Sequence, residues 1–251
     1  DAQLTFSPRV AISHPITESS KLYFNYGHFY QKSIAENLYE ERRKASNQLT
    51  VFGDPNNDQA KTVAYELGFD QSLFDEYLLR ISGYYKDITR QEMYIRYISS
   101  DGKVNYDKLN SNNYADIFGF EVDLSRTQGE WLTGNVNFEY RVGTSGYFGT
   151  LFEYENPSDQ REYLRKNPTI ERPRPIPMVK SWLDFHTPYN FGTKTFGEYL
   201  LGDWHANFIT RWSAGEWDTW NPQQKPGIEY NVQWKSTLNV DFKISKIFKF
   251  G

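Results

Sequence analysis

Charged side chains that alternate with large apolar ones are the residues of this sequence best placed to do chemistry. In one such run Glu66 lies between Tyr65 and Leu67, and similar runs recur along the chain. Alternate side chains of a β-strand point to opposite faces, so each run would have one charged face and one apolar face. The charged face could line a water-filled lumen, or it could be the solvated side of an ordinary sheet. The candidates for facing a lumen are Glu66, Asp70, Arg80, Glu121, Asp123, Glu139, Arg141, His205 and Arg211.

No pattern typical of a catalytic site is present. The sequence contains neither a G-x-S-x-G motif nor a glycine-rich phosphate-binding loop. Glu121 and Asp123 lie two positions apart, but strand alternation alone puts them on one face. We therefore predict that the protein is not an enzyme and uses no cofactor.

Histidine spacing argues against a metal site. His14, His28, His186 and His205 are far apart along the chain, and no two of them form the i, i+4 pair typical of zinc sites on helices. The chain has no Cys, which excludes disulfides and thiolate metal sites within it. No metal site is expected.

The segment from Asp54 to Asp58 begins like a calcium-binding loop, with Asn56 between the two aspartates. Gln59 occupies the position at which such a loop needs Gly, and Tyr65 the position at which it needs Glu. A turn rich in Asp and Asn is the better interpretation.

Trp217 and Trp220 are the candidates for contact with a ligand. They lie close together in a long segment without strand alternation. Their rings could stack on a sugar or on an aromatic ligand, and they could equally anchor a loop to a neighbouring chain.

A period of two, rather than 3.6, dominates the segments that must position these residues. Several of the segments approach the roughly 9–11 residues that a tilted membrane strand needs. The nine predicted strands are Leu4–Ile12, Leu22–Tyr30, Val63–Phe69, Tyr77–Tyr85, Phe118–Leu124, Leu132–Val142, Val179–Phe185, Trp204–Trp212 and Leu238–Ile244.

Composition excludes several classes of protein. The 251 residues include 7 Trp, 19 Tyr and 18 Phe, too many large rings for a disordered chain. The net charge of −4 provides no basic surface for nucleic acid, so no nucleic-acid partner is expected. The longest stretch without Asp, Glu, Lys or Arg is 11 residues, Val142–Phe152, whereas a membrane-spanning helix needs roughly 20.

The connections between the predicted strands alternate in length. Short ones (His14–Ser20, Ser72–Glu76 and Arg126–Glu130) separate long ones (Lys32–Ala60, Gln91–Asn112, Thr144–Pro177 and Ser213–Trp234), and Thr187–Tyr199 is intermediate. Outer-membrane barrels have short periplasmic turns and long outer loops, whereas a soluble sandwich has no such rule. The pattern favours an all-β fold: an antiparallel, up-and-down transmembrane β-barrel, of which about nine strands of a larger barrel are present.

Aromatic residues near the strand ends agree with this interpretation. Rings at these positions suit the aromatic girdles at the two membrane interfaces. They could instead be cross-strand pairs in the core of a soluble protein. The residues are Tyr77, Tyr85, Trp131, Tyr140, Trp204 and Trp212.

Three segments resemble the C-terminal barrel portion of TonB-dependent outer-membrane receptors. Phe6–Arg9 (FSPR), followed by Val10–Ile12, is similar to the family's SPR strand. Gly53–Thr62 (GDPNNDQAKT) resembles the stretch GNPNLKPEKT, although Asn57–Ala60 depart from it. Gly202–Trp204 (GDW) is similar to the family's GGW strand.

The resemblance implies residues 1–251 to be part of one barrel, without the plug domain of the family, in a bacterial outer membrane. Its partners would be outer-membrane lipid, a small ligand, the TonB energy-coupling complex acting through a plug, and a surface lipoprotein. The implied function is energy-coupled uptake of a scarce ligand, such as an iron chelate, cobalamin, an oligosaccharide or a peptide. A passive porin-type barrel and a secreted all-β carbohydrate-binding module are the alternatives.

Overall fold

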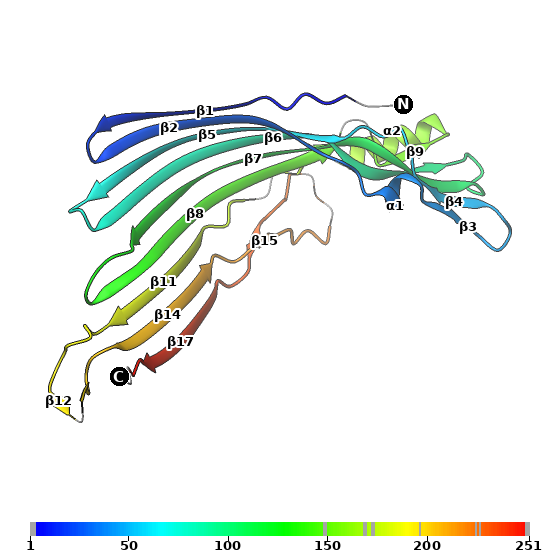
Figure 1. Cartoon of the computed structure of the whole chain (residues 1–251). Helices are drawn as coiled ribbons and strands as arrows, with labels where there is room; N and C mark the ends of the chain where they lie inside the picture. Colours follow the sequence, from blue (N-terminus) through cyan, green and yellow to red (C-terminus); the bar gives the residue numbers. More distant parts are fainter. Residues whose placement is uncertain are drawn as a thin grey trace.

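The computed structural model describes residues 4–147, 150–167, 170–171, 174–195, 197–223, 225 and 227–248. Nine antiparallel strands follow one another across a single curved sheet in chain order, which confirms the predicted all-β, up-and-down fold (Figure 1). The two edge strands do not pair with each other, so the barrel is not closed. The strands are β1 (Arg9–Thr17), β2 (Ser20–Gln31), β5 (Ala60–Leu73), β6 (Tyr77–Ile98), β7 (Asn105–Arg126), β8 (Leu132–Tyr147), β11 (Met178–His186), β14 (Trp204–Ser213) and β17 (Thr237–Lys246).

The first strand begins later than the sequence predicts. Strand β1 runs from Arg9 to Thr17 rather than from Leu4 to Ile12. Pro8 has no N–H to donate, but its carbonyl accepts a hydrogen bond from the N–H of His28 at 2.9 Å, so it marks the start of the pairing. At the other end the pairing of β1 with β2 continues to a tight turn at Thr17 and Ser20.

The predicted loop Gln91–Asn112 is mostly strand. Strands β6 and β7 each have 22 residues, and they stay paired up to Ile98 and Asn105. Their register shifts twice between Ile88 and Met93, and Arg90 there adopts a φ of 60°. A bulge of this kind puts the alternation out of phase, and this hides the strand from a search for period two.

Two long connections add strands to this extension of β6 and β7. Strand β4 (Leu49–Phe52) pairs in parallel with β7 and antiparallel with β3 (Glu41–Arg43), while β9 (Phe152–Tyr154) pairs in parallel with β6. We call this assembly the platform, together with α1 (Ala35–Leu38) and α2 (Pro157–Lys166). The remaining short strands are β10 (Ile170–Glu171), β12 (Lys194–Thr195), β13 (Glu198–Tyr199), β15 (Trp217–Asp218) and β16 (Val232–Gln233).

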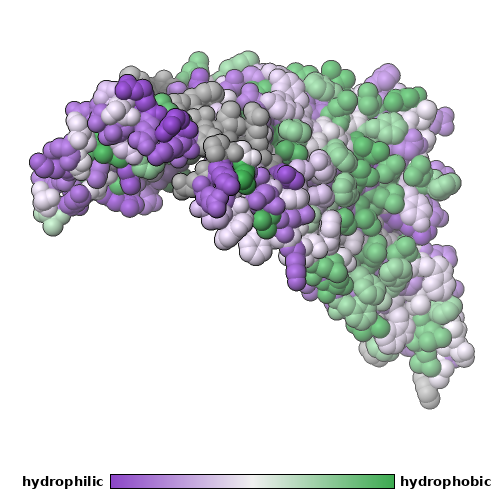
Figure 2. Space-filling view, turned by 180° about the vertical axis from the view of Figure 1, so that it is seen from behind, coloured by the Kyte–Doolittle hydropathy of each residue, from purple (hydrophilic) through white to green (hydrophobic). Residues whose placement is uncertain are grey.

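The distribution of apolar side chains is inverted relative to a soluble protein. Within the described ranges the buried hydrophobic residues are Ile95 and Leu109, both in the platform. In the rest of the nine-stranded sheet, which we call the wall, Phe118, Phe120 and Val136 are 47%, 42% and 38% exposed. Figure 2 shows apolar side chains gathered as a band over the strands, with hydrophilic residues gathered over the platform. A sandwich would bury Phe118, Phe120 and Val136 between two sheets. The nine long strands instead belong to one sheet, and the apolar side chains on one of its faces are exposed.

The tight turns lie at one end of the sheet, which we call the short-turn end. They connect β1 to β2, β5 to β6 and β7 to β8 (Figure 1). The long connections and the platform lie at the opposite end, as the alternation of connection lengths predicts. No helix among the described residues has the length and apolarity required to cross a membrane.

Candidate functional site: the polar face of the sheet

The register joins polar residues from eight neighbouring strands into one transverse row. Strand partners in direct register share a face of the sheet. The row is Lys21, Asp70, Arg80, Asp123, Asn137, Lys180, Arg211 and Asn239, each residue paired with the next. Four of the predicted candidates, Asp70, Arg80, Asp123 and Arg211, therefore lie at one level of one face.

Asp70 is the most enclosed charge of this row. It is 6% exposed, and its Oδ2 lies 3.2 Å from Nζ of Lys21 and 3.7 Å from Nε of Arg80. Asp123 accepts a hydrogen bond of 2.6 Å from Nδ2 of Asn135. A carboxylate taken out of water needs such partners, because burial of an unpaired charge is costly.

Glu121 and Glu139 face each other directly across β7 and β8. Like charges in this position repel. Cations flank Glu139: Nη1 of Arg141 lies 3.6 Å from Oε1, and Nζ of Lys180 lies 3.9 Å from Oε2. The wall therefore carries a mixed-sign patch and not a uniformly acidic one.

Tyr23 lies across the face of β5. Its ring occupies the space over Gly68, where an added Cβ would come within 2.1 Å of the ring. Its hydroxyl donates to Oε1 of Glu66 at 3.2 Å, and Nδ2 of Asn25 donates to Oε2 at 3.2 Å. Gly68 is thus required by the close approach of this ring and not by its own backbone conformation.

Two grooves on this face bring the predicted candidates together. The larger has a volume of about 1030 Å³, and Glu66, Glu121, Glu139 and Arg141 line it. The smaller, of about 440 Å³, is lined by Arg80 and Asp123 and again by Glu66 and Glu121. The register places all nine predicted residues on one face, but Asp70, His205 and Arg211 line neither of these two grooves.

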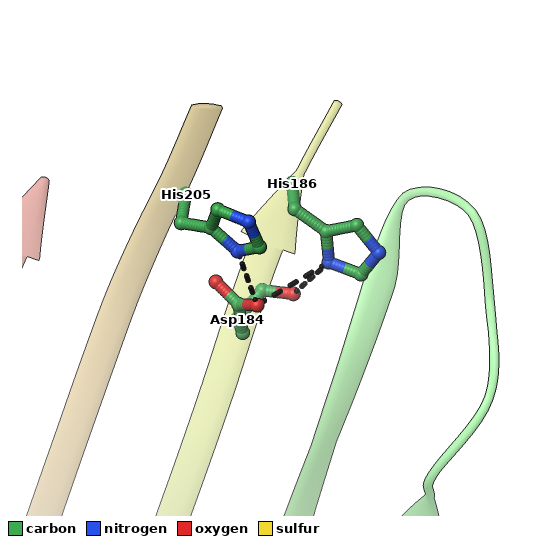
Figure 3. Close-up of side chains that lie close together, drawn as sticks. All are labelled: Asp184, His186 and His205. Atoms are coloured by element: carbon green, nitrogen blue, oxygen red, sulfur yellow. Dashed lines mark hydrogen bonds and ion pairs between the residues drawn. The ribbon is translucent and has the colours of Figure 1, made fainter. Parts of the chain in front are cut away.

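His205 lies beside His186, a proximity that the sequence analysis missed. The two residues are direct partners across β11 and β14, and their rings stack at 5.4 Å between centroids. Asp184 comes between them: its Oδ2 lies 2.9 Å from Nδ1 of His205 and 3.4 Å from Nδ1 of His186 (Figure 3). The i, i+4 criterion applies to helices. The feature of the sequence that could have predicted this contact is that His186 and His205 lie on either side of the same connection between two antiparallel strands.

The two candidate tryptophans differ in their surroundings. Trp217 belongs to β15, and the guanidinium of Arg174 lies over its ring at 4.4 Å. Trp220 is 70% exposed; its backbone N–H donates to Oδ1 of Asn231 at 2.8 Å, and its carbonyl accepts from Nδ2 of Asn231 at 3.1 Å. Trp220 has the free ring face that stacking on a ligand would need.

The platform has a groove of its own, of about 410 Å³, near the tip of the β6–β7 hairpin. Tyr97 and Tyr106 stack at 5.1 Å between centroids and line it together with Tyr154 and Glu155. Hydrogen bonds from the Ser100 hydroxyl (2.6 Å) and N–H (2.7 Å) hold the pKa of the Glu155 carboxyl below its usual value. The groove therefore combines aromatic rings with a carboxylate that stays ionised.

Within the platform, a tyrosine–glutamate contact joins β6 to Glu40, which lies between α1 and β3. The hydroxyl of Tyr94 donates a hydrogen bond of 2.6 Å to Oε2 of Glu40. Burial, and then this bond, raises the pKa of Tyr94 to about 12. The same bond lowers the pKa of Glu40.

The Asp54–Asp58 segment forms the predicted turn. Oδ1 of Asp54 accepts a hydrogen bond of 3.0 Å from the N–H of Asn56, as in an Asx-turn. Lys108 lies 3.5 Å from Asp54, and Arg90 lies 3.9 Å from Asp58. Both aspartates thus have a cationic side chain as a neighbour.

Residues 2–245 match the family model described as "TonB dependent receptor-like, beta-barrel". Among solved structures, the chain is similar to "Copper transporter OprC", at 14% identity and a TM-score of 0.56 over 97% of this chain and 31% of that one. It is also similar to "Structure of the FpvAI-pyocin S2 complex", at 12% identity and a TM-score of 0.55 over 95% of this chain and 27% of that one. The chain thus spans about a third of the length of these structures. The comparison with curated proteins finds no match.

Proposed function

The chain belongs to the TonB-dependent receptor β-barrel family of the bacterial outer membrane, and we propose that it forms part of the wall and outer loops of an energy-coupled importer. Members of this family are receptors and transporters rather than enzymes. In this proposal the apolar face meets lipid and the polar face lines the lumen.

The arrangement of the wall carries the proposal. A row of polar and charged residues crosses eight strands on one face, while phenylalanine, leucine and valine side chains are exposed on the other. In water, so large an apolar surface would drive aggregation; in a bilayer it is the surface that hydrocarbon contacts. Ion pairs such as Lys21–Asp70 would then lie beside the water of the lumen.

Ligand capture is proposed for the end that bears the platform. Stacked tyrosines in the platform groove and the exposed ring of Trp220 are suited to sugars or to planar ligands, which bind aromatic faces. The ligand itself is one of the four classes set out above: an iron chelate, cobalamin, an oligosaccharide or a peptide. Surface lipoproteins would meet the receptor at this end, and TonB would act from the short-turn end through a plug.

Growth under limitation tests the proposal. A strain that depends on this receptor is supplied with one limiting nutrient at a time: an iron chelate, cobalamin, an oligosaccharide or a peptide. We expect one nutrient to support growth only when both the receptor and TonB are present. Equal uptake with and without TonB would show a passive pore instead, and recovery of the protein outside the outer-membrane fraction would contradict the proposal.

A further inference from the structure

We propose that Asp184, His186 and His205 bind a divalent transition-metal cation such as Zn²⁺. The three side chains lie on the polar face where β11 ends and β14 begins, at the short-turn end of the sheet (Figure 3). Asp184 and His186 are two positions apart on β11, and His205 faces His186 across the ladder. The inference concerns this part of the wall alone and holds whichever ligand the receptor imports.

The spacing of the donor atoms suits one metal ion. One ligand atom from each residue lies within 4.8 Å of the other two. A tetrahedral Zn²⁺ with bonds of about 2.0–2.2 Å keeps its ligand atoms roughly 3.3–3.6 Å apart. The separation of 3.4 Å between Oδ2 of Asp184 and Nδ1 of His186 already matches this range, and the 2.9 Å between Oδ2 and Nδ1 of His205 would have to lengthen. Side-chain adjustments would complete the site without movement of the strands.

The tautomer of His186 supports a cation at this place. Its Nε2 lies 2.9 Å from the carbonyl oxygen of Gly129, and since a carbonyl only accepts, Nε2 carries the proton. In the neutral ring Nδ1 then holds a lone pair, 3.3 Å from the backbone oxygen of Asp184 and 3.4 Å from its Oδ2. The Nδ1 lone pair is repelled by both of these oxygens. A cation placed between them would be coordinated by Nδ1 and by the oxygens, which removes the repulsion. Histidines that ligate metals usually donate their other N–H to a carbonyl or a carboxylate in this way.

Asp184 provides a second, independent observation. It is 8% exposed, and its Oδ1 is buried without a hydrogen-bond partner in the described part of the chain. An unpaired buried carboxylate oxygen is costly, and bidentate coordination or a metal-bound water would satisfy it. The side chains of His186 and His205 remain 15% and 26% exposed, which leaves an approach for the ion.

The donor set selects the class of metal. Two imidazoles and one carboxylate suit Zn²⁺, Cu²⁺ or Ni²⁺, whereas Mg²⁺ and Ca²⁺ prefer oxygen ligands throughout. Three protein ligands leave a fourth position for water. A bound ion would cross-link β11 to β14, and through His186 it would fix the β7–β8 turn at Gly129.

Calorimetric titration with ZnCl₂ tests the site on the protein purified in detergent and stripped with chelator. We expect one saturable Zn²⁺ per chain, and binding at least about tenfold weaker in His186→Ala, His205→Ala and Asp184→Asn. His14→Ala is the matched control, because His14 lies exposed on β1, and it should bind as the parent does. Heat-dependent gel mobility verifies that each variant keeps its barrel.

Cobalt gives a readout that a structural role would not produce. Co²⁺ in place of Zn²⁺ should show the intense visible bands of tetrahedral nitrogen and oxygen coordination, absent in the double variant His186→Ala/His205→Ala. The proposal is overturned if the parent binds no more metal than that folded double variant. In that case the three side chains form a hydrogen-bonded cluster only.

Discussion

At the scale of single residues, the two faces of a wall strand differ in what they tolerate. Val122 is on the apolar face between Ile81 and Phe138, and Glu121 is on the polar face. Val122→Arg should destabilise the barrel by about 2–4 kcal/mol if this side chain lies near the bilayer midplane. Unfolding by urea in lipid vesicles measures the change.

Glu121→Arg is the matched control. It replaces one of two opposed carboxylates by a cation opposite Glu139, so it should be mild or slightly stabilising. Equal losses of stability at positions 121 and 122 would contradict a wall with lipid on one side.

The packing of Tyr23 over Gly68 makes a second prediction at this scale. Gly68→Ala should cost about 1–3 kcal/mol, because the new methyl group displaces the ring. Tyr23→Ala in the same chain should restore most of the loss. Gly83→Ala, whose Cβ would meet its nearest atom at 3.9 Å, should be tolerated. Thermal unfolding of the parent and these three variants gives the comparison, and a double variant no more stable than Gly68→Ala would refute the contact.

The residues that share the polar face could be predicted, because the alternation of side chains between the two faces is a local property of each strand. Their partners could not, since the pairing of Lys21 with Asp70 depends on turn lengths and bulges. The same reason hid His186 and His205: the register of a hairpin, and not spacing along the chain, brings their rings together.

At the scale of elements, the Tyr94–Glu40 contact, which joins β6 to the segment between α1 and β3, should depend on pH at both extremes. Because folding lowers the pKa of Glu40, its carboxylate adds stability at pH values above the pKa of an unfolded glutamate. This stability is lost as the pH falls through the lowered pKa of the folded state. The pKa of Tyr94, raised to about 12, adds stability below about pH 10, which is lost as pH rises through 12. The contact should therefore be strongest between these limits.

Ultraviolet titration of the tyrosine phenols measures the pKa of Tyr94 and its dependence on Glu40. The difference between the parent and Tyr94→Phe should contain one tyrosine with a midpoint near 12. Glu40→Gln should lower that midpoint, because it removes the anion beside the phenol. A midpoint near 10 in the parent would show that the hydrogen bond is not formed.

The existence and order of the nine long strands were predictable from the sequence, although β1 begins later than predicted and the outer parts of β6 and β7 were predicted as a loop. The platform was not. Strands β4 and β9 join the edges of the β6–β7 extension through parallel pairs between residues about 55 positions apart, such as Val51 with Asp107 and Arg96 with Phe152. Nothing local in a sequence encodes such pairings.

At the scale of the whole molecule, the proposed orientation can be tested by labelling. The 251 residues contain no Cys, so single cysteines can be introduced without competing thiols in this part of the protein. Asp101→Cys lies in the β6–β7 turn and Asp75→Cys in the β5–β6 turn. A membrane-impermeant maleimide should label the first in intact cells and the second only after the outer membrane is opened. The reverse pattern would invert the orientation.

In the proposed importer, the length of β6 and β7 sets how far from the lipid a ligand would first bind. Their 22 residues reach about 70 Å at roughly 3.3 Å per residue, against about 30 Å for the hydrocarbon of a bilayer. Even when tilted, the pair extends beyond the lipid, and β4 and β9 pair with its two edges. With a tilt of about 45° the pair would span about 50 Å along the bilayer normal, so in the proposed orientation a ligand bound at its tip would be held about 20 Å beyond the hydrocarbon.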